Sequence, residues 1–204
     1  MNGIIRKTPW ALMSFLAVGV AGYALAMVLV PGSRGEFVVD MFADDPLATH
    51  AHLLGGAIAL SLGAFQFSQR LRTRHLGLHR WMGRTYVIAV AIGGVAGLYM
   101  ALTTPGGSAA QFGFSCMAIA WLITTAMAYI RIRQKDVLRH RMWMVRSYAV
   151  TLAAVTLRFY FPIGLMNGYP FESVYPVLAW ICWVPNLLIA EWVLLPIMNR
   201  RPVH

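Results

Sequence analysis

Six long apolar stretches divide this chain, and they limit its possible folds more than any other feature does. They cover residues 9–30, 50–69, 81–103, 112–132, 142–162 and 174–197. A helix needs about 20 residues to cross a bilayer core of about 30 Å, and each stretch is long enough. Backbone polar groups find no water inside lipid, so a spanning segment must be a helix or part of a closed barrel, and these stretches lack the alternation of strands. The sequence therefore predicts an all-α bundle of six transmembrane helices, which forms one integral membrane domain over residues 1–204.

The composition excludes most other classes of protein. Hydrophobic residues make up 59% of the chain and charged residues only 12%, whereas a soluble domain carries about 25% charged residues. A water-soluble fold, a disordered chain and a coiled coil are all inconsistent with these values. Cys116 and Cys182 both lie inside apolar stretches, so they indicate neither a disulfide framework nor a metal motif.

The positive charges lie almost entirely on one side of the predicted membrane. All but two of the 17 Lys and Arg residues flank the same helix ends, and the exceptions are Arg34 and Arg158. These flanking residues are Arg6, Lys7, Arg70, Arg72, Arg74, Arg80, Arg84, Arg131, Arg133, Lys135, Arg139, Arg141, Arg146, Arg200 and Arg201. Such a bias predicts that both termini are cytoplasmic and that the protein lies in the inner (plasma) membrane. The net charge of +10 then reflects topology, and it requires no nucleic-acid partner.

The first apolar stretch has features of a secretory signal peptide. Arg6 and Lys7 precede it, and Ala24-Leu25-Ala26 imitates a cleavage site. The apolar run from Trp10 to Val30 is longer than the usual hydrophobic region of about 7–15 residues, and it continues past the alanines. We therefore expect an uncleaved first helix.

A six-residue motif occurs twice in the chain. Residues 81–86 read Trp-Met-Gly-Arg-Thr-Tyr, and residues 143–148 read Trp-Met-Val-Arg-Ser-Tyr, 62 positions later. A His-Arg pair precedes each copy. We interpret residues 50–103 and 112–162 as two copies of one helical hairpin, related by an axis along the membrane normal. The segments 9–30 and 174–197 would flank this four-helix core.

The duplication gives two histidines equivalent positions. His79 and His140 stand just before the two copies of the motif, so we expect them to face each other near the cytoplasmic end of the bundle. Two histidines on facing helices are a common way to hold a haem iron. His79 lies two residues before its Trp and His140 lies three before. This shift of one residue amounts to about 100° of helix rotation.

Two polar residues are predicted near the outer end of the core. His52 shares a helix face with Gly55, Gly56, Ala59 and Gly63, and such a stripe of small residues allows another helix or a flat ligand to approach closely. Arg158 lies at the outer end of the fifth stretch, where a cation in the membrane often has a function.

Two weaker metal hypotheses follow from the remaining histidine and methionine positions. Met117 is a candidate to complete a His/Met pair with His52. His75 and His79 share one helix face, but no glutamate and no third ligand stands beside them, so zinc is not expected. A glycine-rich phosphate loop is also missing, so no nucleotide is expected.

Several motifs resemble one family of bacterial predicted membrane proteins, grouped as domain of unknown function 2306. They are His52–Gly55, Gly63–Phe67, Leu78–Tyr86, His140–Tyr148 and Thr156–Arg158. The resemblance covers about residues 50–160.

The run from His75 to His79, after a basic turn, is similar to the ascorbate-reducible transmembrane b-type cytochromes. Those are six-helix proteins whose four-helix core holds two bis-His haems and passes electrons across the membrane. The resemblance implies that His79 is a ligand on the third helix and His52 one on the second, and that His140 stands where a fifth-helix ligand belongs. The fourth stretch contains no histidine, so the outer haem lacks a ligand in this sequence.

These observations lead to a first functional hypothesis, a b-type cytochrome-like redox protein. His79 and His140 would ligate haem b, and Arg84 and Arg146 would neutralise its propionates. His52 and Arg158 would form an outer polar site for a quinone or another small redox partner. If the protein is an enzyme, it would be a transmembrane oxidoreductase.

Two alternatives do not need haem. In one, the cytoplasmic Arg/His cluster binds a lipid or a quinone. In the other, the chain is a structural subunit that assembles with a membrane partner or with further copies of itself.

Overall fold

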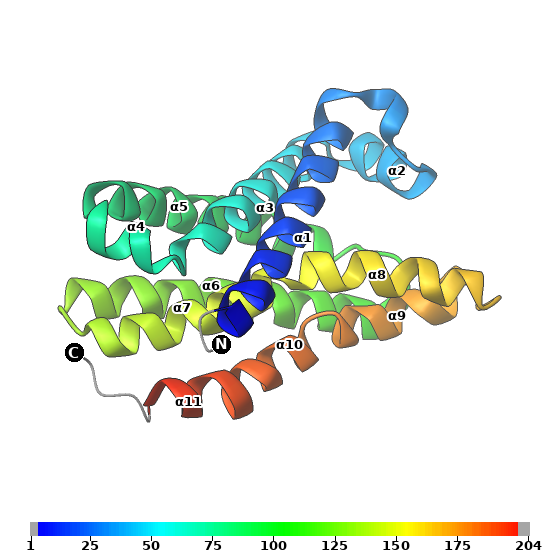
Figure 1. The fold of residues 1–204 in the computed structure, drawn as a ribbon. Helices are drawn as coiled ribbons and strands as arrows, with labels where there is room; N and C mark the ends of the chain where they lie inside the picture. Colours follow the sequence, from blue (N-terminus) through cyan, green and yellow to red (C-terminus); the bar gives the residue numbers. More distant parts are fainter. Residues whose placement is uncertain (1–3, 200–204) are drawn as a thin grey trace. The chain divides into compact units, whose positions relative to one another are not determined.

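The computed structural model describes residues 4–199, with side chains from Trp10 to Met198. Within this range the secondary structure is helical, without strands (Figure 1). The elements are α1 (Ile4–Leu29), η1 (Pro31–Ser33), α2 (Glu36–Asp44), α3 (Pro46–Gln66), α4 (Gln69–Arg74), α5 (Leu76–Ala101), α6 (Gly107–Arg133), α7 (Val137–Thr151), α8 (Ala153–Met166), α9 (Phe171–Ile181), α10 (Val184–Ile189), η2 (Ala190–Leu194) and α11 (Leu195–Asn199).

Six helical segments of the described chain are long and apolar enough to cross a membrane, which confirms the predicted fold class. They are Trp10–Leu29, Pro46–Gln66, Leu76–Ala101, Gly107–Arg133, Val137–Met166 and Phe171–Met198. The third and fifth begin about five residues earlier than the apolar stretches do, because their first turns are basic and escape a search for apolar runs. The chain forms two compact units, residues 1–96 (unit 1) and residues 97–204 (unit 2).

Unit 1 is organised by α3, which packs against α1 and α5. Asp45 caps α3, since its side chain accepts a hydrogen bond of 2.8 Å from the backbone N–H of Ala48, and the expected Asp-Pro start at Pro46 is confirmed. The backbones of α3 and α5 meet at Gly55 and Gly93. A Cβ atom added to Gly55 would lie 2.8 Å from the Cα of Gly93, so only glycine fits at this crossing.

The loop between the first two spans contains a helix that the sequence analysis did not anticipate. This helix, α2, is amphipathic: Glu36, Asp40 and Asp44 are exposed, and Phe42 is buried with Met27 and Leu53. This amphipathic helix has nine residues, so a search for spans of about 20 residues does not detect it.

Arg34 connects α2 to the end of α1. Its Nε donates to the carbonyl of Met27 at 2.7 Å and its Nη2 to that of Val28 at 3.2 Å, while its guanidinium lies 3.7 Å from the ring centre of Phe42. The last carbonyls of a helix lack intrahelical partners, and here a cation satisfies two of them.

Unit 2 is organised by the pair α6 and α7, which are joined by buried hydrogen bonds. Trp121 donates its indole N–H to the hydroxyl of Thr151 at 2.8 Å, and the hydroxyls of Thr125 and Ser147 are 2.7 Å apart. On another side of α6, Gly113 allows α9 to approach, because a Cβ at Gly113 would lie 2.7 Å from the Cβ of Ala179.

The last span is interrupted twice. It breaks at Cys182 and Trp183, where Pro185 removes a backbone donor and its ring would clash with the carbonyl of the preceding turn. Thr156 and Asn186 both donate hydrogen bonds to the carbonyl of Cys182 at this break. Further along, η2 is a π-helix, and such insertions often occur at functional sites.

Candidate functional site

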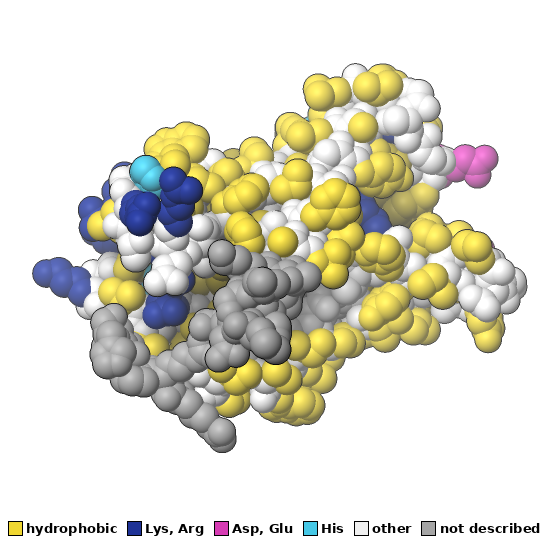
Figure 2. All heavy atoms as spheres, in the orientation of Figure 1, with side chains coloured by type: hydrophobic (Ala, Val, Ile, Leu, Met, Phe, Trp, Pro, Cys, Tyr) yellow, Lys and Arg dark blue, Asp and Glu magenta, His cyan; other side chains and the backbone are white. Residues whose placement is uncertain are grey.

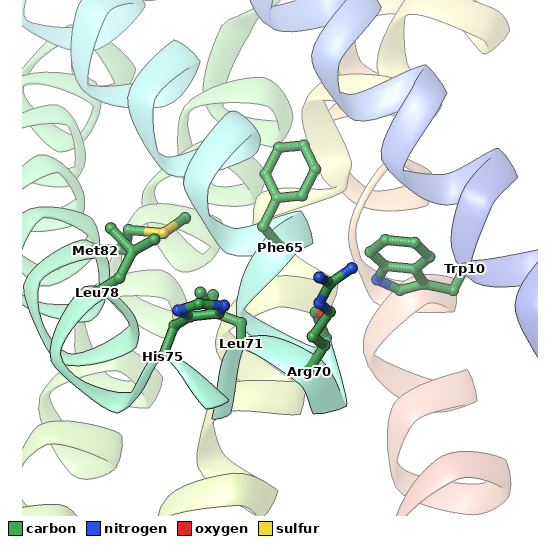
Figure 3. A pocket seen from close by; sticks show the side chains of 8 residues that line it. Trp10, Phe65, Arg70, Leu71, His75, Leu78 and Met82 are labelled. Atoms are coloured by element: carbon green, nitrogen blue, oxygen red, sulfur yellow. The ribbon is translucent and has the colours of Figure 1, made fainter. Parts of the chain in front are cut away.

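A pocket of about 400 Å³ lies in unit 1, where α1, α3, α4 and α5 meet (Figure 3). Its lining residues are Trp10, Phe65, Ser68, Arg70, Leu71, His75, Leu78 and Met82. The ring of Trp10 is held in place, because its indole N–H donates to the carbonyl of Ala64 at 3.1 Å. In the view of Figure 3, Arg70 extends into the space between Phe65 and Trp10. The pocket therefore combines apolar walls with a cation.

The short helix α4 carries Arg70, Arg72 and Arg74, and it lies beside the pocket. It begins after Ser68 and ends at Arg74, with Arg72 and Arg74 in its last turn, where positive charge is favourable for the helix dipole. Figure 2 shows Lys and Arg side chains gathered over α4 and the adjoining end of α5. In the sequence this segment appears as a basic turn. The pocket beside it cannot be read from the sequence, because it depends on the packing of Trp10 from a distant helix.

His79 and His140 occupy the same position in their helices, the fourth residue of α5 in unit 1 and the fourth of α7 in unit 2. Each is linked to the preceding membrane-spanning segment, His79 to α3 and His140 to α6. The side-chain amide of Gln66 donates to the carbonyl of His79 at 3.2 Å, and Nδ1 of His140 lies 2.9 Å from the carbonyl of Ala128. Gln66 and Ala128 are themselves 62 residues apart, whereas His79 and His140 are 61 apart, and the contact uses the backbone carbonyl of His79 in one hairpin and the ring of His140 in the other.

The contact of His140 also determines its tautomer. A carbonyl oxygen can only accept a hydrogen bond, so Nδ1 of His140 carries the proton. In the neutral ring, Nε2 then presents its lone pair. Metal-ligating histidines commonly have this arrangement, in which the second ring nitrogen donates to a backbone carbonyl.

His52 lies at the close crossing of α3 and α5. Its Nδ1 is 2.9 Å from the carbonyl of Gly93, one turn of helix from the contact of Gly55 with Gly93. On the predicted small-residue face of His52, Gly55 does admit a close neighbour, whereas a Cβ at Gly56 would meet no atom within 4 Å. The neighbour on this face is a helix, and it leaves no room for a flat ligand at Gly55.

Arg146 is bound through two hydrogen bonds to a carboxylate and through a ring contact. Its Nε and Nη2 donate to the two carboxylate oxygens of Glu191, at 2.5 and 2.9 Å, and its guanidinium lies 4.6 Å from the ring centre of Trp143. Glu191 belongs to η2, the π-helical turn. This partner cannot be recognised in the sequence, because 45 residues and two helix breaks separate Arg146 from Glu191.

Arg84 and Arg158 differ from Arg146, the first in its exposure and the second in its bond to a backbone carbonyl. Arg84 is exposed on α5. Arg158 is half-buried and donates to the carbonyl of Ala154 at 2.9 Å, one turn back in α8. Arg158 lies in unit 2 and His52 in unit 1. Arg200 and Arg201, which the sequence places among the cytoplasmic cations, lie outside the described residues.

Within residues 4–199, no three His, Cys, Asp or Glu side chains gather as a metal-binding group. The sulfur of Met117 lies 4.0 Å from that of Cys182 inside unit 2.

A family model confirms the resemblance to the predicted membrane proteins that the sequence motifs suggested. The family model described as "Predicted membrane protein (DUF2306)" matches residues 49–194. The chain belongs to this family. Neither a curated protein nor a solved structure matches the chain. The DUF2306 match runs from the first turn of α3 to the end of η2, and it therefore includes both copies of the six-residue motif, His79, His140 and the Arg146–Glu191 pair. The similarity to b-type cytochromes stays a prediction.

Proposed function

We propose that this DUF2306 protein binds an anionic phospholipid in the pocket of unit 1, at the cytoplasmic face of the inner membrane. Arg70 would contact the phosphate and the apolar walls would hold an acyl chain. The observation that carries the proposal is the placement of a guanidinium in a pocket that is otherwise lined mainly by Trp10, Phe65, Leu71, Leu78 and Met82.

The size and chemistry of the pocket support such a ligand. Small-molecule sites typically enclose about 300–1,000 Å³, with apolar walls and a few polar groups that fix orientation, and the pocket of about 400 Å³ is in this range. His75 and Ser68 add hydrogen-bonding groups beside Arg70.

The charge of α4 supports the same ligand. Arg70, Arg72 and Arg74 lie within one short helix, and the sequence predicts that this helix is cytoplasmic. The cytoplasmic leaflet carries a negative surface potential, and each Lys or Arg near it contributes about 1 kcal/mol of attraction. Three arginines in six residues therefore favour anionic over zwitterionic lipids.

The proposal can be tested by native mass spectrometry of the protein purified in a mild detergent. Phosphatidylglycerol should remain bound in preference to phosphatidylcholine. Arg70→Gln should lower this retention about tenfold, because a charge-assisted hydrogen bond contributes about 1.5–3 kcal/mol. Arg139→Gln is a matched control, since Arg139 is exposed and pairs with Asp136 at 3.5 Å. Equal retention of both lipids by the unchanged protein would refute the proposal.

A second candidate function is binding of haem b by His79 and His140, with electron transfer in the membrane. The observation in its favour is the hydrogen bond from Nδ1 of His140 to Ala128, which leaves Nε2 as the nitrogen for iron. Haem would supply a one-electron redox centre, and a quinone would be a suitable acceptor. Arg84 would be available for a propionate, whereas Arg146 is already held by Glu191.

The haem hypothesis has its own test. A reduced-minus-oxidised spectrum of the protein expressed with added haem precursor should show sharp b-type bands. His140→Ala and His79→Ala should each abolish these bands, while His75→Ala, on the neighbouring turn, should leave them unchanged. A featureless spectrum would exclude this function and leave the lipid proposal untouched.

A further inference from the structure

The duplicated motif places an arginine at the same position relative to a buried tyrosine in both units. Tyr86 and Tyr148, which end the two copies, are buried, with exposures of 0% and 2%. In each copy the arginine stands two residues before the tyrosine. Two residues correspond to about 200° of helix rotation, so each arginine lies on the side of its helix opposite its buried tyrosine.

Unit 2 shows what this motif binds. Arg146 is stacked on Trp143, and its planar fork holds both oxygens of the Glu191 carboxylate. Arginine is well suited to such two-point recognition of a carboxylate or a phosphate. The tryptophan, one turn earlier in the helix, supports the guanidinium from one face.

Unit 1 has the same tryptophan and arginine but lacks the carboxylate. Trp81 is 61% exposed and Arg84 is also exposed. Among the side chains that the structure describes, none forms a hydrogen bond or an ion pair with Arg84.

The acidic residues of unit 1 are too far away to fill this position. They lie between Glu36 and Asp45, before α3 begins. The contact of Gln66 with His79 places the start of α5 at the other end of α3, and the 21 residues of α3 extend about 30 Å. A partner for Arg84 must therefore come from outside the unit.

The position of Arg84 along its helix favours such a partner. Arg84 is the ninth residue of α5, about 12 Å from the start of a helix that is about 39 Å long. If the helix is centred in a hydrocarbon core of about 30 Å, Arg84 lies several ångströms inside the core. A lone cation at this depth is unfavourable, whereas Trp81, one turn earlier, lies at the interface where tryptophan is common.

We propose that Trp81 and Arg84 form an open site for the oxyanion of a lipid, in the position that Glu191 takes at Arg146. The ligand is either the carboxylate of a fatty acid or the phosphate of a phospholipid. This site is separate from the pocket of unit 1. Met82 lines the pocket, and Arg84 lies about 200° around the helix from it.

Native mass spectrometry with three added probes tests the site: oleate, phosphatidylglycerol and phosphatidylcholine. The unchanged protein should retain oleate or phosphatidylglycerol more than phosphatidylcholine. Arg84→Gln should lower the retention of the bound probe about tenfold, and Arg84→Lys should lower it less, because a lysine keeps the charge but loses the fork. Arg139→Gln should have no effect.

The outcomes distinguish a fatty-acid carboxylate from a phospholipid phosphate, and the Arg84 site from the pocket of Arg70. Loss of oleate alone in Arg84→Gln identifies a carboxylate ligand, and loss of phosphatidylglycerol alone identifies a phosphate. Unchanged retention of both probes in Arg84→Gln overturns the site, whatever Arg70→Gln does at the pocket. As a check on folding, the bound probe should raise the melting temperature of the unchanged protein more than that of Arg84→Gln. An equal rise in these two proteins also overturns the proposal.

Discussion

Arg146 and Glu191 connect two membrane-spanning segments of unit 2 through paired hydrogen bonds of 2.5 and 2.9 Å. Their side chains are only 19% and 36% exposed. Each charge is therefore partly withdrawn from solvent, and each depends on the other for neutralisation. Removing one partner should be worse than removing both.

We expect Glu191→Gln to lower the free energy of unfolding by about 1–3 kcal/mol. The lower end of this range reflects the partial exposure of the pair, and the upper end is the effect of leaving a buried cation alone. Thermal unfolding in detergent, followed by circular dichroism, measures the change. The double variant Arg146→Gln with Glu191→Gln should recover part of the loss, and strict additivity of the two single changes would show that the residues do not interact.

The crossing of α3 and α5 predicts a large effect from a small substitution. Gly55→Ala should destabilise the protein by about 1–3 kcal/mol, because the added Cβ would lie 2.7 Å from the carbonyl oxygen of Ala89 and 2.8 Å from the Cα of Gly93. Gly56→Ala is the matched control, since no atom lies within 4 Å of a Cβ at that position. Equal melting temperatures for the two variants would contradict the close crossing.

The buried hydroxyl pair between α6 and α7 should contribute measurably to stability. Thr125→Val keeps the shape of the side chain but removes the 2.7 Å hydrogen bond to Ser147. The expected loss is about 0.6–1.7 kcal/mol, the range for hydrogen bonds between membrane helices. Thr73→Val serves for comparison, because Thr73 is exposed and bonds only within α4. If both variants unfold at the same temperature, the hydroxyl pair does not stabilise the helix contact.

Arg34 should control the order of α2. Arg34→Gln removes the cation from the carbonyls of Met27 and Val28 and from the ring of Phe42. We expect faster amide hydrogen exchange over Glu36–Asp44, while exchange in α3 stays as it was. Arg133→Gln, which affects an exposed arginine near Tyr129 within α6, should leave exchange in α2 unchanged. Equally slow exchange in Arg34→Gln would show that α2 is held by its apolar residues alone.

The sequence predicted the parts of the fold that depend on local chemistry. Six apolar stretches, the Asp45-Pro46 helix start and the close-packing face at Gly55 are all visible in short segments, and the structure confirms them. The first turns of α5 and α7 were missed because they are charged. The amphipathic α2 was missed because it is too short to span a membrane.

The candidate sites were only partly predictable, because they depend on contacts between distant residues. The sequence identified Arg146 from its repeated motif but could not connect it to Glu191 across the breaks in the last span. It identified the cations of α4 but not the pocket, which needs Trp10 from another helix. The two cations that break the charge bias, Arg34 and Arg158, both donate to backbone carbonyls, a use that a count of charges does not reveal.

The contact between Gly55 and Gly93 has a consequence for how the protein is made. These glycines belong to consecutive spans, so their helices can pair as soon as the second one leaves the ribosome and enters the bilayer. The main chains then meet with no lipid tail between them, and the hairpin enters later assembly as a preformed piece. A mutation that holds these backbones apart should therefore reduce the yield of inserted protein before it affects any mature activity.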